Sequence, residues 1–133
     1  MRLSEYKELV METKPLEVEI GLLHERICSA LGDPTRILIL YMLSEKGMFV
    51  NEISEALNIP QSSVSRHLRI LRERSLVATD RQGTAVLYTL PDKRIITALD
   101  LMREILSTQL RQEAKITSAI HEKKLIGEKG VKE

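Results

Sequence analysis

The side chains with the most suggestive chemistry are short hydroxyl groups and basic groups gathered within residues 61–81. Short polar side chains let a helix approach the major groove of DNA closely, and arginine binds guanine O6 and N7 or a phosphate. Residues 61–90 hold five arginines against Glu73 and Asp80, a net charge of +3 in a chain whose total is +1. We therefore expect a DNA-reading surface whose contact residues are Gln61, Ser62, Ser63, Ser65, Arg66, His67, Arg69, Arg72 and Arg81.

These residues are expected to divide the work of recognition. Ser65 and Arg66 should face base edges, whereas Arg81, at the tip of a predicted hairpin, should reach the flanking minor groove or phosphates. His67, beside Leu68, fits a partly buried packing role as well as a base contact, and both interpretations stay open. The plainer alternative, an amphipathic helix with merely solvated arginines, does not explain the turn that precedes this segment or the hairpin that follows it.

The segment around these residues predicts a helix-turn-helix. In the basic helix Val64, Leu68 and Leu71 recur at i, i+4 and i+7 and should face the core. A helix is predicted over Phe49 to Leu57, with Val50, Ile53 and Leu57 inward; Asn58 suits its left-handed end and Pro60 suits the start of the next helix. The spacing of about three residues between the two helices is typical of the motif.

A hairpin is predicted directly after the basic helix. Its strands are expected over Leu76 to Thr79 and Ala85 to Leu90, joined through residues 81–84, where Gly83 supplies a positive φ. Together with the helix-turn-helix this predicts a mainly α fold with a small β-hairpin wing, that is, a winged helix-turn-helix.

Long helices should flank this unit. Residues 1–14 fit a short helix, and Pro15 fits the first turn of a longer one whose apolar residues run from Leu16 to Leu31. Asp33-Pro34 should start the next helix, in which residues 37–43 are apolar on every side and should be covered all round. Pro91-Asp92 should cap a final helix of about seven turns. We expect an N-terminal extension over 1–14, the winged helix-turn-helix domain with its dimerisation helices over 15–122, and a polar, disordered tail over 123–133.

Composition restricts the class of protein. The single cysteine, Cys28, forms no intrachain disulfide, which fits a reducing cytosol. The longest apolar run, residues 37–43, is far short of the roughly 20 residues that span a bilayer, and the N-terminal residues do not resemble a signal peptide. No Ser/His/Asp set, carboxylate pair or phosphate-binding glycine loop is present. We expect a cytoplasmic protein that is not an enzyme, needs no cofactor and has no membrane partner.

Four motifs resemble the ArsR/SmtB family of bacterial and archaeal repressors: Leu31 to Arg36, Glu52 to Leu57, Ser62 to Leu68 and Val86 to Leu90. The resemblance covers roughly residues 16–110. It implies a homodimeric winged-helix repressor that binds a palindromic operator in double-stranded DNA and releases it when an effector binds. It also implies that the first and last helices build the dimer interface, for which the apolar candidates are Leu16, Ile20, Leu23, Ile27, Leu99, Met102, Leu106 and Leu110.

The chain departs from the metal-sensing members of that family. The stretch Met48 to Glu52 has no thiolate, and Asp92-Lys93-Arg94 with Ile105 and Thr108 replaces the usual ligands of the last helix. We therefore predict no conventional metal site. A soft-metal or thiol-reactive sensor at the dimer interface stays an alternative, as does an architectural DNA-binding protein without a ligand. We expect Cys28 to pack in the core, and the remaining candidate ligands are His24, Cys28 and His121.

Overall fold

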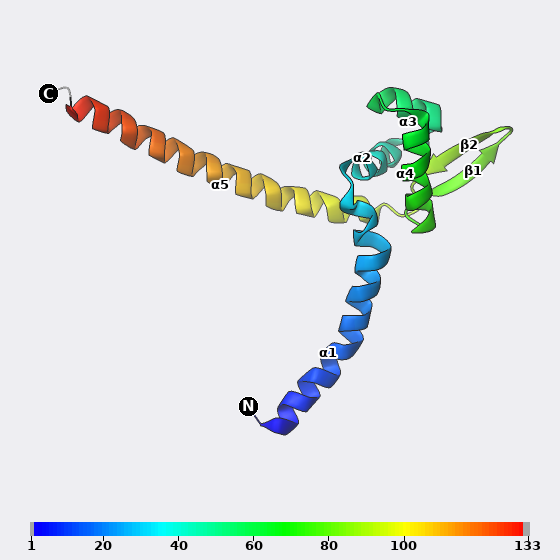
Figure 1. Cartoon of the computed structure of the whole chain (residues 1–133), viewed down its shortest axis with the longest axis horizontal. Helices are drawn as coiled ribbons and strands as arrows, with labels where there is room; N and C mark the ends of the chain where they lie inside the picture. The colour runs from blue at the N-terminus through cyan, green and yellow to red at the C-terminus, as the bar shows by residue number, and fades with distance from the viewer. Residues whose placement is uncertain (1, 132–133) are drawn as a thin grey trace. The chain divides into compact units, whose positions relative to one another are not determined.

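The computed structural model describes residues 2–131, and within them the side chains of residues 2–5, 7, 8 and 14–124. The elements follow the predicted fold class, mainly α with a small hairpin (Figure 1). The chain divides into two compact units, residues 1–93 and 94–133. In chain order the helices and strands are α1 (Leu3–Leu23), the π-helical turn η1 (His24–Cys28), the 3-10 turn η2 (Ala30–Gly32), α2 (Pro34–Glu45), α3 (Val50–Leu57), α4 (Gln61–Glu73), β1 (Ala78–Gln82), β2 (Ala85–Thr89) and α5 (Arg94–Val131).

The first helix corrects the prediction for the N-terminal part of the chain. α1 is continuous from Leu3 to Leu23 and carries Pro15 in its interior, so Pro15 does not start a second helix. Proline removes one backbone hydrogen bond and crowds the preceding turn, which usually bends or breaks a helix. The leucine, glutamate and lysine residues on either side favour helix strongly enough for it to continue. After Leu23 the backbone widens into η1 and then tightens into η2, so the regular helix ends earlier than the expected residue 31.

The start of α2 confirms the predicted cap. The Asp33 carboxylate accepts a hydrogen bond from the Thr35 backbone N–H at 2.8 Å, and Pro34 occupies the first helical position. That backbone hydrogen bond holds the pKa of the Asp33 carboxyl below its usual value. The Asp33 cap and Pro34 both lie at the first turn of the helix that they stabilise.

The apolar run over residues 37–43 predicted that this helix would be covered on every side. In the structure α2 packs in the centre of the first unit, but one of its sides stays exposed. Ile39, Leu40 and Leu43 are buried, whereas Leu38 is 52% exposed. A helix turns through 3.6 residues, so the three buried residues mark the face that α4 and the other elements cover. The apolar residues of α2 predict that the helix is buried, but the sequence does not show whether the same chain or a partner covers each side.

The core of the first unit joins α2, α3 and α4 to the hairpin. Its fully buried side chains are Ile39, Leu40, Ile53, Val64, Leu68 and Leu71. The segment before α3 is tied to β2, because Met48 N–H donates to the Tyr88 carbonyl at 3.0 Å and Tyr88 N–H donates to the Met48 carbonyl at 2.9 Å. The helix-turn-helix and the wing therefore share one hydrophobic core.

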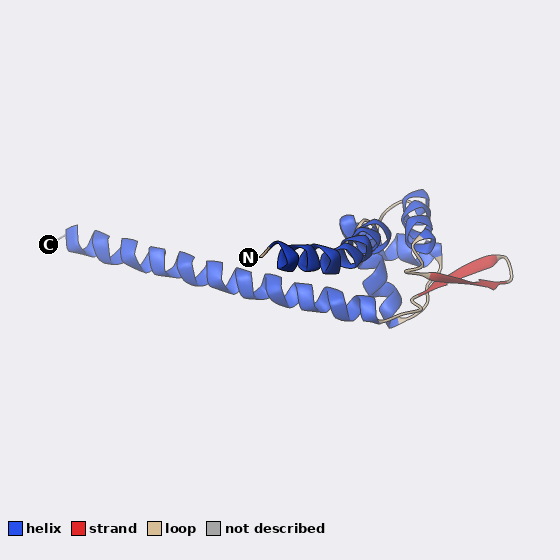
Figure 2. Cartoon of the chain, turned by 90° about the horizontal axis from the view of Figure 1, so that it is seen from below, coloured by secondary structure: helices blue, strands red, loops and turns tan. Residues whose placement is uncertain are grey.

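The hairpin forms, with a shifted first strand (Figure 2). β1 and β2 are antiparallel, with Ala78 opposite Thr89 and Gln82 opposite Ala85, so the turn consists of Gly83 and Thr84. Gly83 has φ +65°, as a two-residue hairpin turn beginning with glycine requires. The strand does not start at residue 76, because Leu76 N–H instead closes the end of α4 on the Leu71 carbonyl at 2.9 Å.

The last helix is longer than predicted. α5 begins at Arg94 and continues to Val131, whereas the sequence predicted an end near residue 122 and a tail over 123–133. Residues 123–131 are helical in the structure, and 132–133 lie outside the described residues. None of the helices in the described part of the chain is long and apolar enough to cross a membrane.

Candidate nucleic-acid interface

The turn between α3 and α4 is held by its own backbone and side chains. Asn58 adopts the left-handed conformation, with φ 53°, as predicted from its position. Ile59 N–H donates to the Ser54 carbonyl at 3.2 Å, and the Ser54 hydroxyl donates back to the Ile59 carbonyl at 2.6 Å. The carbonyl of Pro60 then accepts from the first turn of α4. These bonds fix the angle at which α4 leaves the turn.

α4 has one buried face and one exposed polar face, as the spacing predicted. Val64, Leu68 and Leu71 are 0% exposed. Ser63 and His67 lie on the border and are half-buried. The exposed face carries Gln61, Ser62, Ser65, Arg66, Arg69 and Arg72. A row of hydroxyl, amide and guanidinium groups on a helix that is anchored by a rigid core is what reading a DNA groove requires.

His67 packs against α2 rather than lying free on the exposed face. Its Nδ1 lies 3.3 Å from Nη1 of Arg36, and Nε of Arg36 donates to the Ala30 carbonyl at 2.6 Å. Of the two interpretations of His67, the structure matches the partly buried packing role, and a DNA contact stays a prediction for the rest of its ring. Arg36 was missed from the sequence, because 31 residues separate it from His67 and no local pattern links them.

Glu73 is a second residue of this surface that was not assigned a role. Its Oε1 lies 3.4 Å from Nε of Arg69, and the two side chains are 63% and 81% exposed. The i, i+4 spacing is the sequence signal that predicts such a pair. An exposed ion pair contributes little to stability, but it places a carboxylate beside a candidate phosphate ligand.

Arg81 lies within the wing rather than at its tip. It is part of β1, opposite Val86, and the turn begins two residues later at Gly83. Its side chain is exposed, as are those of Asp80 and Gln82. Arg81 therefore keeps an open approach to a backbone phosphate, although Asp80 beside it offsets part of its charge.

A shallow hollow of about 340 Å³ separates the wing from the start of α3 and α4. It is lined mainly by apolar side chains, with Asn51 and Gln61 as polar groups, and includes Phe49 and Tyr88. This is the region where the sequence predicted no thiolate. In the part of the chain that the structure describes, no three His, Cys, Asp or Glu side chains gather as a metal site.

The candidate ligands His24, Cys28 and His121 are all exposed. The prediction that Cys28 packs in the core is therefore wrong for the single chain. Cys28 ends the π-helical turn, and Ala30, two residues later, takes the buried position at 1% exposure. The change of helical pitch after Leu23 alters which residues face inward, so the geometry of a regular 3.6-residue helix does not describe this stretch.

The predicted interface helices expose apolar stripes. On α1, Leu16, Ile20 and Leu23 are 53%, 51% and 43% exposed, and Ile27 in η1 is half-buried. Leu99, also a predicted interface residue, is 4% exposed, and its place in the interface stays a prediction.

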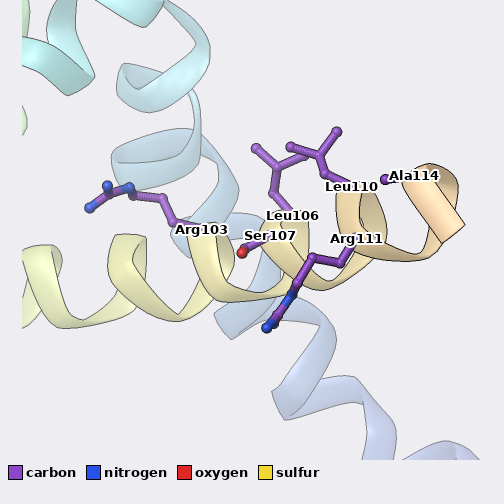
Figure 3. Close-up of a pocket in the computed structure, with 6 residues that line it drawn as sticks. All are labelled: Arg103, Leu106, Ser107, Leu110, Arg111 and Ala114. Atoms are coloured by element: carbon purple, nitrogen blue, oxygen red, sulfur yellow. The ribbon is translucent and has the colours of Figure 1, made fainter.

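On α5 the stripe continues along one side of the helix. Met102, Leu106 and Leu110 are 50%, 52% and 54% exposed. Figure 3 shows Leu106 and Leu110 projecting to the same side of α5, beside a hollow of about 390 Å³ that Arg103, Arg111 and Ala114 also line. The predicted interface residues on α5 other than Leu99 therefore remain available to a partner.

Comparison with known proteins gives consistent matches. Residues 33–79 match the family model for bacterial regulatory proteins of the arsR family. An uncharacterized HTH-type transcriptional regulator of Methanocaldococcus jannaschii is 39% identical over 80 residues, which cover 59% of this chain and 90% of that protein. The HTH-type transcriptional regulator NmtR of Mycobacterium tuberculosis is 35% identical over 86 residues, 65% of this chain and 72% of NmtR.

One solved structure shares the fold over most of its length. It is a fragment from Mycobacterium bovis, described as a homodimeric winged helix-turn-helix DNA-binding domain. The TM-score is 0.62 at 22% identity, over 71% of this chain and 87% of the fragment. At that identity the match shows the fold.

Proposed function

The chain belongs to the ArsR family of bacterial regulatory proteins, which are DNA-binding transcriptional regulators, and from this premise we propose that it is a homodimeric, sequence-specific repressor. The observation that carries the proposal is the exposed polar face of α4 opposite a fully buried one. α4 enters the major groove, where Ser65 and Arg66 contact base edges. The remaining reading residues proposed for the backbone or flanking bases are Gln61, Ser62, Ser63, Arg69, Arg72 and Arg81.

The dimer follows from the unpartnered apolar stripes. α1 and α5 each carry large aliphatic side chains about half exposed, which a monomer in water does not hide. The Mycobacterium bovis fragment with the same fold is described as homodimeric. A two-fold dimer presents two copies of α4, so its operator is a palindrome with half-sites about one helical turn apart.

Release from the operator is proposed to depend on an effector that acts on the dimer helices rather than on a conventional metal site. The resemblance to the family implies metal ligands in the stretch Met48 to Glu52 and on the last helix, but that stretch holds no thiolate here, and the corresponding positions on the last helix are Ile105 and Thr108. An effector dissociates the complex only if it binds the DNA-free state more tightly than the DNA-bound state. A shift of the dimer helices changes the spacing between the two copies of α4, which must match the two half-sites.

The test begins with selection of duplexes from a random-sequence library by the full chain, followed by footprinting of the enriched sequence. The enriched duplex should bind at least roughly 10³-fold more tightly than a scrambled duplex. Arg66→Ala should lose about 1–3 kcal/mol of binding to the selected duplex and should relax the preference at one base position.

Two results would contradict the proposal. A specific-to-scrambled ratio near one indicates an architectural DNA-binding protein instead of a repressor. Unchanged affinity and base preference in Arg66→Ala shows that α4 is not the reader.

A further inference from the structure

One guanidinium connects the backbone after α1 with the helix that reads DNA. Arg36 on α2 donates through Nε to the Ala30 carbonyl at 2.6 Å, and its Nη1 lies 3.3 Å from Nδ1 of His67 on α4. Ala30 is 1% exposed and lies in η2, so the acceptor belongs to well-packed backbone.

The chemistry of this contact assigns a role to each partner. Arginine carries five N–H donors and no acceptor, so Nδ1 of His67 takes part in a hydrogen bond as the unprotonated acceptor. The ring proton of a neutral His67 is then on Nε2. The planar guanidinium holds two acceptors in fixed directions at once, which a lysine ammonium on a flexible stem does less well.

Such a contact supplies what the apolar core of α4 lacks. Val64, Leu68 and Leu71 fix how deeply α4 is seated, but hydrophobic burial has no preferred direction. A hydrogen bond does depend on direction, so the contact at His67 restrains rotation of α4 about its own axis. Arg66, the residue before His67, lies on the exposed face, where a small rotation displaces its guanidinium relative to a base edge.

We propose that Arg36 is a positioning residue for DNA reading: it holds His67 as a hydrogen-bond acceptor and so sets the rotation of α4 relative to the backbone at Ala30. Arg36 touches no base in this assignment and acts through His67. The inference rests on the proposed function, since it requires α4 to read DNA.

The test uses a matched pair of variants at His67 in the full chain. Asn in His67→Asn places an oxygen near the position of Nδ1 and keeps an acceptor, whereas His67→Leu keeps the bulk and removes it. The probes are the duplex enriched by the wild-type chain and a scrambled duplex, and the measured quantity is the ratio of the two dissociation constants. Thermal unfolding of each variant establishes that it is folded.

The expected results form a double-mutant cycle. His67→Leu and Arg36→Gln each lower the ratio about tenfold, and His67→Asn, which keeps the acceptor, lowers it several-fold less than His67→Leu does. The double variant Arg36→Gln/His67→Leu should show a total loss of about tenfold relative to the wild type, the same as either single variant. The losses do not multiply to about a hundredfold, because both changes break the same contact. Should Arg36→Gln not fold, Arg36→Lys replaces it with the same expectation, since it keeps the charge and loses the two-acceptor geometry.

Equal losses in His67→Asn and His67→Leu, or losses that multiply in the double variant, overturn the inference. Arg66→Ala separates this failure from failure of the proposed function. If Arg66→Ala abolishes the preference for the selected duplex while the losses of Arg36→Gln and His67→Leu multiply in the double variant, α4 reads DNA without the help of Arg36. If the wild-type chain enriches no sequence, the proposed function fails and the positioning role fails with it.

Discussion

Replacing Leu106 by aspartate is the sharpest test of the dimer. Leu106 is 52% exposed on the apolar stripe of α5, so about half of its side chain is available for burial by a partner. Burying a whole leucine contributes roughly 1.5–3 kcal/mol, which makes the lost half worth about 1 kcal/mol. A carboxylate placed in the same interface adds a desolvation penalty of at least about 2 kcal/mol.

Two-fold symmetry applies both effects twice. Each dimer contains two copies of the substitution, so the total loss is about 6 kcal/mol, or roughly a 10⁴-fold weaker dimer. We expect sedimentation velocity at about 1 µM to show a wild-type dimer and a Leu106→Asp monomer. The monomer should retain its helices by circular dichroism and should lose binding to the selected duplex.

The matched control is Ser118→Asp, which introduces the same group in the same helix. Ser118 is exposed and lies about 120° around α5 from Leu106, away from the stripe. It should leave the dimer intact, because its carboxylate stays in water. A Leu106→Asp chain that remains dimeric, or a wild-type chain that is monomeric at this concentration, would refute the assignment of α5 to the interface.

Three further outcomes are expected. Arg81→Ala should weaken binding to selected and scrambled duplexes alike and reduce the slope of log affinity against log salt by roughly one; a change in base preference with an unchanged slope would contradict a phosphate contact. Glu73→Gln should strengthen binding to all duplexes a few-fold at low salt, because Arg69 loses its competing carboxylate, and titrations in low and high salt check whether the gain disappears on screening. Asp33 has a lowered pKa, chiefly through the backbone hydrogen bond from Thr35, so its stabilising effect should be complete well above its ordinary value of 3.8 and be lost as the pH falls below it; urea unfolding of wild type and Asp33→Asn should converge at low pH, and a constant difference would exclude this linkage.

Much of the reading unit could be predicted from the sequence, because its determinants are local. The i, i+4, i+7 spacing of Val64, Leu68 and Leu71 defines a helix face from the 3.6-residue repeat alone. Asn58 and Asp33 act within one turn of backbone, where residue type and position dictate conformation. Once this buried face of α4 is identified, the remaining residues of the helix define its exposed face.

The errors occurred where a local pattern did not determine its surroundings. Pro15 predicts a helix start, yet neighbours on both sides keep α1 continuous. Cys28 follows a change of helical pitch that the sequence did not reveal, and it is exposed. Periodicity identifies an apolar face, whereas burial depends on what packs against it.

The pair of Arg36 and His67 shows the same division most clearly. The sequence alone placed both residues on helices and left two interpretations of His67 open. Only the packing of α2 against α4 brings Nη1 within 3.3 Å of Nδ1 across 31 residues. Helix periods and caps are properties of a few consecutive residues, whereas a contact between helices depends on the directions in which every intervening turn sends the chain.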